Sequence, residues 1–369
     1  MVPSPLEFSA DRIFKGPGFA ETLFLGTVDG QRIIRKASNP DARDFSRLAL
    51  IREIILLRNL PETLAPYFPG LIRTNLGDRD ETSTDLPEII FYDLPYYAPE
   101  DGWTTLSTLL VDGALNSDIA RKVIAEIVEI TFTYFCLDER IPAKNYVDTT
   151  MLSAIRGSIK WAYADPDFSE LLSRREFTVN GRVMRNIPGL MDYFDDTNAM
   201  RELLTPHRDR FLHGDFFPEN ILYNTITGRW LLLDPVSVRG VHRGDFVLDL
   251  NKMEDWLTGE LPALRLGRFT LDISGSSVDF TLHRQTGDLS NLHSSGLAEW
   301  YGELIRLPAY KSLFADEEGW EHRWRFVKAF YALCMLPLAD KRQAVARYFL
   351  ALQAMADFAV DVERRDLNK

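Results

Sequence analysis

The segment FLHGDFFPENILYNTITGRWLLLDP, residues 211–235, joins charged and amide side chains to two short apolar runs. The runs 221–223 and 230–233 flank a polar turn that contains glycine, which is typical of a β-hairpin. If the runs pair antiparallel, their outer ends meet, so Asn220 and Asp234 become neighbours at the open end. An amide oxygen and a carboxylate at one point are hard ligands that suit Mg²⁺ bound together with phosphate oxygens.

Asp215 precedes this hairpin, in a loop bent by Gly214 and Pro218. A carboxylate here can accept a proton from a hydroxyl group while a metal ion steadies phosphates. Each residue alone also has a plainer explanation, because Asp and Asn in turns commonly cap backbone groups. Asp215, Asn220 and Asp234 together favour a phosphate-transfer site.

The composition is that of a globular protein, with 46% hydrophobic and 26% charged residues. The length of 369 residues suggests two or three compact units. No apolar run is long enough for a transmembrane helix, and the first residues show no signal-peptide pattern, so no membrane association is expected. The net charge of −12 argues against a nucleic-acid partner. The only cysteines, Cys136 and Cys334, fit a reducing cytoplasm.

Outside the central segment, residues 12–37 predict strands around turns, with a glycine-rich break at 16–18 and an Asp-Gly hairpin turn. Apolar spacing predicts a helix over 41–60, and 87–97 predicts a buried strand. Further helical patterns cover 118–139, 150–163, 292–307 and 320–362, while 267–285 alternates like a second hairpin. The sequence therefore predicts an α+β fold, with a small strand-rich lobe over 1–97 and a larger, mainly helical lobe over 98–369.

HGDFFPEN followed by LLLDP resembles the catalytic and metal-binding segments of the aminoglycoside phosphotransferase and choline kinase group. These are small-molecule kinases with a two-lobed, protein-kinase-like fold. The resemblance implies ATP, with GTP as an alternative, and Mg²⁺ as cofactors. It assigns Asp215 as the catalytic base and Asn220 and Asp234 as Mg²⁺ ligands. It also implies that His213 braces the loop, and that Asp249, in RGDFVLDL, holds the loop from a helix start, where an ordinary N-cap is the plainer role.

The same resemblance assigns nucleotide-binding residues to the first lobe. GPGFAET, with Gly16 and Gly18, stands where the group has its phosphate-covering loop. RIIRKA stands at the strand whose basic residue contacts the α- and β-phosphates. Strand alternation sends Arg35 and Lys36 to opposite faces; the role in the family favours Lys36, with Arg35 as the alternative. Glu53 would pair with that cation, although a solvated helix charge is the commoner fate of a glutamate.

FYDLPYY resembles the connector between the lobes, whose backbone would pair with adenine around Asp93 to Tyr96. A Pro-Val pair follows Asp234 where protein kinases have Phe-Gly, and only nine residues separate Asp234 from Gly244. This spacing leaves no long activation segment, so a small-molecule acceptor is favoured over a protein.

The sequence thus predicts a phosphotransferase that acts on a hydroxyl group of a small metabolite, with a sugar-like compound favoured over an amino-alcohol or aminoglycoside. An inactive nucleotide-binding scaffold and an atypical protein kinase are the alternatives.

Scattered histidines disfavour a zinc site, and no Gly-x-Ser-x-Gly elbow is present. The aromatic-rich C-terminal segment predicts core helices. The 267–285 hairpin either covers an acceptor pocket or decorates the periphery. The oligomeric state stays open.

Overall fold

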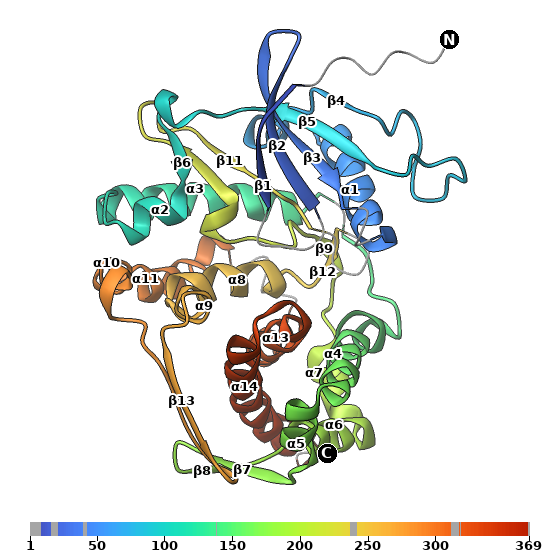
Figure 1. Ribbon diagram of the computed structural model, residues 1–369. Coiled ribbons are helices and arrows are strands. Elements are labelled where there is room, and N and C mark those ends of the chain that lie inside the picture. Colours follow the sequence, from blue (N-terminus) through green and yellow to red (C-terminus); the bar gives the residue numbers. More distant parts are fainter. Residues whose placement is uncertain are drawn as a thin grey trace. The chain divides into compact units, whose positions relative to one another are not determined.

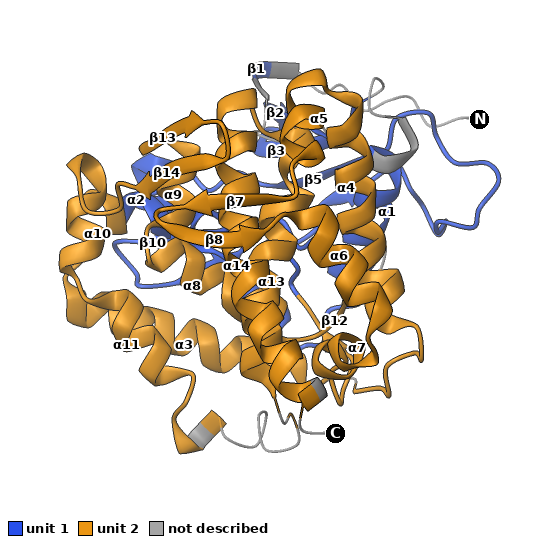
Figure 2. Ribbon diagram, turned by 90° about the horizontal axis from the view of Figure 1, so that it is seen from below, with its two compact units in different colours: residues 1–109, 213–242 blue, residues 110–212, 243–369 orange. Residues whose placement is uncertain are grey.

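The computed structural model of the protein describes residues 9–15, 21–39, 43–137, 139–236, 242–310, 317 and 319–367. Contacts group the chain into two units, which Figure 2 colours separately. The first consists of Met1–Leu109 and His213–His242, and the second of Leu110–Leu212 and Arg243–Lys369. This division differs from the predicted boundary near residue 97, because the hairpin at 221–234 pairs with a strand that follows that boundary.

A five-stranded antiparallel sheet of the order β1-β2-β3-β5-β4 belongs to the first unit (Figure 1). Its strands are β1 (Ser9–Lys15), β2 (Glu21–Val28), β3 (Gln31–Ser38), β4 (Arg73–Thr74) and β5 (Phe91–Pro95). The strands predicted within 12–37 and 87–97 are therefore confirmed.

The connection between β2 and β3 is the Asp-Gly pair that predicts a hairpin. Asp29 has a φ of 50° and Gly30 a φ of 79°, and Val28 pairs with Gln31 across the turn. Two consecutive positive φ angles in a two-residue loop match the twist of the flanking strands. The turn fixes the register of the hairpin.

The helix expected over 41–60 is α1 (Arg43–Arg58). Leu50, Ile51 and Ile54 are fully buried, at spacings that put them on one helix face. This helix contacts β3, and Figure 1 shows it beside that strand. The same packing buries Glu53, which the sequence alone would leave in solvent.

A three-stranded sheet completes the first unit, in the order β11-β10-β6. Its strands are β6 (Trp103–Thr105), β10 (Ile221–Asn224) and β11 (Trp230–Leu232). Ile221 pairs with Leu232 and Tyr223 with Trp230, so the hairpin predicted from the central segment is confirmed. Tyr67 stacks on Trp230 with ring centroids 4.7 Å apart and covers one side of the hairpin.

Helices make up most of the second unit, and α2 (Leu106–Val111) crosses into it. The others that the structure describes are α3 (Ser117–Phe135), α4 (Ser153–Ala164), α5 (Pro166–Ser173), α6 (Ile187–Asp196), α7 (Asn198–Leu204), α8 (Val247–Leu257), α9 (Glu260–Arg265), α10 (Ser290–Ser294), α11 (Leu297–Leu304), α13 (Trp320–Cys334) and α14 (Lys341–Leu367). The helices predicted over 118–139 and 150–163 are confirmed, the second with a π-helical turn before it.

The helical patterns over 292–307 and 320–362 are confirmed, and each of them is divided into two helices. The pattern over 292–307 is broken at Gly296, whose φ of 63° ends α10 before α11 begins. The pattern over 320–362 is broken between α13 and α14 by a 3₁₀ turn, Leu336–Leu338, that contains a proline. Proline lacks the N–H that a continuing helix requires.

A mixed four-stranded sheet of the order β13-β14-β7-β8 also lies in the second unit. It consists of β7 (Glu176–Val179), β8 (Arg182–Arg185), β13 (Phe269–Ser274) and β14 (Ser277–Leu282). The 267–285 hairpin is therefore confirmed, whereas the β7–β8 hairpin was not predicted. A role of this sheet over an acceptor pocket stays a prediction.

The chain enters and leaves the 213–242 segment through two short strands of the second unit. These are β9 (Arg210–Phe211) and β12 (Arg243–Gly244), which pair antiparallel.

Aromatic side chains of the C-terminal segment are core residues, as predicted: Phe326 and Phe358 are fully buried, with ring centroids 5.0 Å apart. Across the described ranges, no helix has both the length and the apolar content needed to cross a membrane.

Candidate functional site

Lys36 of β3 is the centre of a buried ionic cluster in the first unit. The residue is only 6% exposed. Its ammonium donates to Glu53 Oε2 at 2.8 Å and to Asp234 Oδ1, and it pairs with Glu21 Oε2 at 3.1 Å. The cluster therefore joins β2, β3, α1 and the end of the β10–β11 hairpin.

Burial and charge act in opposite directions within this cluster. Burial lowers the pKa of Lys36, but the carboxylates of Asp234 and Glu53 outweigh it and raise that pKa well above its usual value. Burial raises the pKa of Glu53 to about 7, against the opposing effect of Lys36. Burial is also the main reason that the pKa of Glu21 is raised. The neighbouring carboxylates thus stabilise the charged form of Lys36, whereas burial disfavours the charged form of Glu53.

Two members of the cluster are missing from the sequence-based prediction. Tyr92 lies opposite Lys36 in the β3–β5 register, and its hydroxyl donates to Glu53 Oε1. Glu21 lies on β2, two residues from Leu23, which is opposite Lys36. Residues two apart on a strand share a face, so the register set by the Asp-Gly turn contains the signal for Glu21.

Arg35 lies on the other face of β3 and binds a different carboxylate. Its guanidinium donates to both side-chain oxygens of Asp93, at 2.8 and 3.0 Å, and Arg73 of β4 also donates to Asp93. Asp93 is fully buried, so the arginines neutralise a carboxylate that would otherwise be costly to bury. Strand alternation did not decide whether Arg35 or Lys36 has the role of the phosphate-binding cation. Lys36 is the residue that contacts Glu53 and Asp234.

The connector residues that were expected to pair with adenine have other backbone partners. The Asp93 carbonyl accepts a hydrogen bond from Ile72 N–H at 2.9 Å, and β5 has a neighbouring strand on each side of Asp93. The Tyr96 N–H donates to the Arg32 carbonyl at 3.3 Å. An internal strand uses its backbone groups within the sheet, so Asp93 is unsuited to an adenine contact. An adenine contact at Tyr96 stays a prediction.

The loop that carries Asp215 is braced by His213. The buried His213 ring accepts a hydrogen bond from Asp215 N–H at Nδ1, 3.3 Å away, and stacks against Phe68 with centroids 6.3 Å apart. The Val236 N–H donates to the His213 carbonyl at 2.8 Å. These contacts hold the loop against the chain that follows the hairpin.

Asn220 and Asp234 lie at the open end of the hairpin, as antiparallel pairing predicts. The Leu233 N–H donates to the Asn220 carbonyl at 2.8 Å, and the Asn220 side chain donates to Asp215 Oδ2 at 2.8 Å. Asp234 has a φ of 59°, a left-handed conformation that is uncommon outside glycine and concentrates at functional sites. Its side chain is 40% exposed, so it is accessible to a ligand.

The remaining predicted residues are Asp249, Gly16 and Gly18. Asp249 belongs to the second unit, where it is fully buried in the first turn of α8. It is not the N-cap, which is Phe246. The N–H of Val247, the first residue of the helix, donates to Asp245 Oδ1 at 3.2 Å. The bracing role of Asp249 stays a prediction. Gly16 and Gly18 lie outside the described residues.

The oxygen donors at the hairpin end fit a magnesium ion held by few protein ligands. Within the part of the chain that the structure describes, no group of three His, Cys, Asp or Glu is arranged to hold a metal. Mg²⁺ typically takes one or two carboxylates and completes its shell with water and phosphate oxygens. Three carboxylates, those of Glu21, Glu53 and Asp234, surround one lysine, and this excess of negative charge favours a cation.

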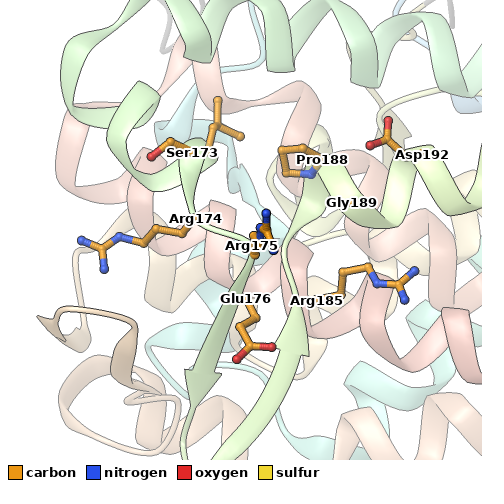
Figure 3. Close-up of a pocket in the computed structure, with 9 residues that line it drawn as sticks. Ser173, Arg174, Arg175, Glu176, Arg185, Pro188, Gly189 and Asp192 are labelled. Carbon is orange, nitrogen blue, oxygen red and sulfur yellow. The ribbon is translucent and has the colours of Figure 1, made fainter.

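A surface pocket of about 660 Å³ lies in the second unit (Figure 3). Its wall comes from the end of α5, the start of β7 and the first turns of α6, and it mixes arginine with acidic side chains. None of the described residues predicted to bind nucleotide or metal lines it, so the pocket does not identify the reaction centre.

No protein-family model matches the sequence, and no curated protein matches it. Solved structures do match. A thermostable mutant of aminoglycoside phosphotransferase APH(4)-Ia, in complex with AMP-PNP and hygromycin B, is 12% identical with a TM-score of 0.48, over 95% of both chains. A candidate fructosamine-3-kinase from Haemophilus somnus 129PT is 11% identical with a TM-score of 0.47, over 95% of this chain and 92% of that one.

A candidate aminoglycoside phosphotransferase from Ralstonia eutropha JMP134 is 14% identical, with a TM-score of 0.54. The alignment covers 98% of this chain and 94% of that one, so the likeness extends over both units. At this level of identity it establishes a common fold. The protein therefore has the fold of that structure, and the α+β fold class expected from the sequence is confirmed.

Proposed function

We propose that the protein transfers a phosphoryl group from ATP to a hydroxyl group of a small metabolite. One observation carries the proposal: Lys36 contacts Glu53 and Asp234 at once, at the hairpin end where Asn220 holds Asp215. In protein kinases a lysine on a strand pairs with a glutamate on a helix, and a metal-binding aspartate completes the phosphate site. The fold held in common with the Ralstonia structure supports the same reaction class.

Each residue of the cluster has a role in this proposal. Lys36 contacts the phosphates, and Glu53 orients its ammonium. The side-chain oxygens of Asn220 and Asp234 would hold Mg²⁺. When bound, Mg²⁺ would neutralise the charge that develops on phosphate oxygens.

Asp215 is the proposed base for the acceptor hydroxyl. Its carboxylate is partly exposed, and the hydrogen bond from Asn220 Nδ2 to Oδ2 fixes its orientation. A carboxylate held in this way aligns the hydroxyl for attack and receives its proton. The rate enhancement comes mainly from positioning and charge stabilisation.

The acceptor is proposed to be a small molecule, with sugars and sugar-like compounds as the first class to test. The support is the short interval between Asp234 and Gly244, which leaves no room for a long segment that would dock a peptide. Amino-alcohols and aminoglycosides are the next classes. GTP is the alternative phosphoryl donor.

The test is nucleotide consumption with Mg²⁺ and either ATP or GTP, against separate pools of sugars, amino-alcohols and aminoglycosides. Wild type is compared with Asp215→Ala, and with Asp78→Ala as a control at an exposed position of the same unit. Consumption that depends on one pool, persists in Asp78→Ala and disappears in Asp215→Ala supports the proposal. Turnover that survives in Asp215→Ala refutes the assignment of the base, and the absence of nucleotide binding in wild type refutes the function.

A further inference from the structure

Glu21 contacts the lysine of the proposed phosphate site. It is the first residue of β2, and its Oε2 lies 3.1 Å from Lys36 Nζ. The carboxylate of Asp234 contacts the same ammonium. Burial is the main reason that the pKa of Glu21 is raised, and the negative charges of Asp234 and Asp215 add to it. A glutamate in these surroundings gains its stabilisation from Lys36.

The ammonium of Lys36 has no further capacity for an anion. An ammonium has three N–H donors, and three carboxylates, those of Glu21, Glu53 and Asp234, already surround it. Since the lysine is nearly fully buried, it cannot turn toward a new partner in solvent. A phosphate oxygen can therefore bind Lys36 only in exchange for a carboxylate.

Glu21 is the carboxylate most easily exchanged. Glu53 is fixed in the core by a second hydrogen bond, from Tyr92, and its side chain is 5% exposed. Asp234 is more exposed, at 40%, but it is the proposed metal ligand and is anchored by the hairpin end. Among the described residues, Glu21 has Lys36 as its single ion-pair partner, and its side chain is 22% exposed, so it can move into water when the contact breaks.

We infer that Glu21 is a built-in competitor of the nucleotide: its carboxylate occupies the position on Lys36 that a nucleotide phosphate takes, and nucleotide binding displaces it. The inference rests on the proposed function, because it requires Lys36 to bind phosphate. Glu21 then lowers the affinity for polyphosphate ligands, both by competition for Lys36 and by charge repulsion. It acts on the phosphates and leaves the affinity for the nucleoside unchanged.

The test is calorimetric binding of ATP with Mg²⁺, and separately of adenosine, to the full chain. The variants are Glu21→Gln and Glu21→Ala, with Glu62→Gln as a control that removes the same charge at an exposed site of the same unit. Loss of a partly exposed ion pair should tighten ATP binding about three- to tenfold. Adenosine affinity should stay unchanged, and Glu62→Gln should bind both ligands like wild type.

Tighter ATP binding in both Glu21 variants, without a change for adenosine, supports the inference. Unchanged or weaker ATP binding overturns it and leaves the proposed function intact, because wild type still binds ATP. An equal gain for adenosine also overturns it, since the effect would then not involve the phosphates. If neither wild type nor the Glu21 variants bind ATP, the proposed function fails, and this inference fails with it.

Discussion

Gly214 and Val236 approach each other so closely that a β-carbon at position 214 would lie 1.8 Å from the Val236 carbonyl oxygen. Gly214 also has a φ of 83°, in the region that favours glycine. The contact occurs where the loop of Asp215 meets the chain that follows Asp234. Glycine at this position therefore allows the two proposed catalytic segments to lie against each other.

Replacement of Gly214 by alanine should destabilise the first unit and reduce phosphotransfer strongly. The positive φ alone costs about 1–2 kcal/mol for a residue with a β-carbon, and the backbone overlap should bring the total above about 3 kcal/mol. Gly30→Ala is the control, because Gly30 has a similar φ of 79° but no atom within 4 Å of the added carbon. Urea unfolding measures both, and an equal loss in the two variants would show that the overlap has no effect.

The titration of Glu53 should make stability depend on pH. Burial raises the pKa of Glu53 to about 7 from an ordinary value of 4.5, so the folded state binds this proton more tightly than the unfolded chain. The contribution of Glu53 to stability is therefore greatest below pH 4.5, falls as pH rises to 7, and is constant above that. Relative to Glu53→Gln, the free energy of unfolding of wild type should fall by up to about 3 kcal/mol over this range. Urea unfolding at pH 5 and pH 8 measures this difference. If the free energies of unfolding of wild type and Glu53→Gln differed by the same amount at both pH values, the raised pKa of Glu53 would be contradicted.

The two cations of β3 should respond differently to replacement. Lys36→Met removes the proposed phosphate contact, so ATP binding should weaken at least about tenfold. Arg35→Met should leave ATP binding close to that of wild type, because Arg35 binds Asp93 on the other face of the strand. It should instead lower the free energy of unfolding by about 1–3 kcal/mol, since Asp93 is left buried with one arginine. Calorimetry measures ATP binding by the two variants, and urea unfolding measures their stability. Loss of ATP binding in Arg35→Met, but not in Lys36→Met, would show that Arg35 is the phosphate-binding residue.

Replacement of Asn220 by alanine should raise the requirement for Mg²⁺. The variant lacks one proposed metal ligand, so the Mg²⁺ concentration for half-maximal turnover should increase by about tenfold or more. The maximal rate should fall as well, because the hydrogen bond to Asp215 Oδ2 is lost. Asn59→Ala, at an exposed position after α1, is the control. A Mg²⁺ titration that is the same for Asn220→Ala and wild type would exclude Asn220 as a ligand.

Local turn chemistry explains which parts of the fold could be predicted from the sequence. The Asp29–Gly30 turn and the central hairpin have registers that follow from a few residues, so the neighbouring positions of Asn220 and Asp234 follow as well. The break at Gly296 and the unpredicted β7–β8 hairpin are also local events. The Asn180–Gly181 pair, with φ angles of 50° and 80°, is itself a strong hairpin signal, so that hairpin could have been predicted.

Tertiary packing determines what the sequence could not decide. Strand alternation separates Arg35 from Lys36, but only the packing of α1 on β3 shows which of the two contacts Glu53. The predicted adenine contact at Asp93 is unsupported for a similar reason. Its backbone lies between two strands because β4 pairs with β5, and β4 has only two residues, too few to be predicted from the sequence. Burial of Glu53 likewise depends on Tyr92, which is distant in sequence.

Arg323 in the second unit should be far more sensitive to replacement than its neighbour Arg325 on the same helix. Arg323 is fully buried between Asp245 and Glu317, at 2.5 and 2.7 Å, and neither acid is exposed. Arg323→Met leaves two buried carboxylates without this cation and should cost about 3–5 kcal/mol. Arg325 pairs with Asp361 but is half exposed, so Arg325→Met should cost no more than about 1 kcal/mol. Urea unfolding of the two variants gives the comparison. Equal losses in the free energy of unfolding would show that water reaches Arg323 and its two carboxylate partners and screens their charges.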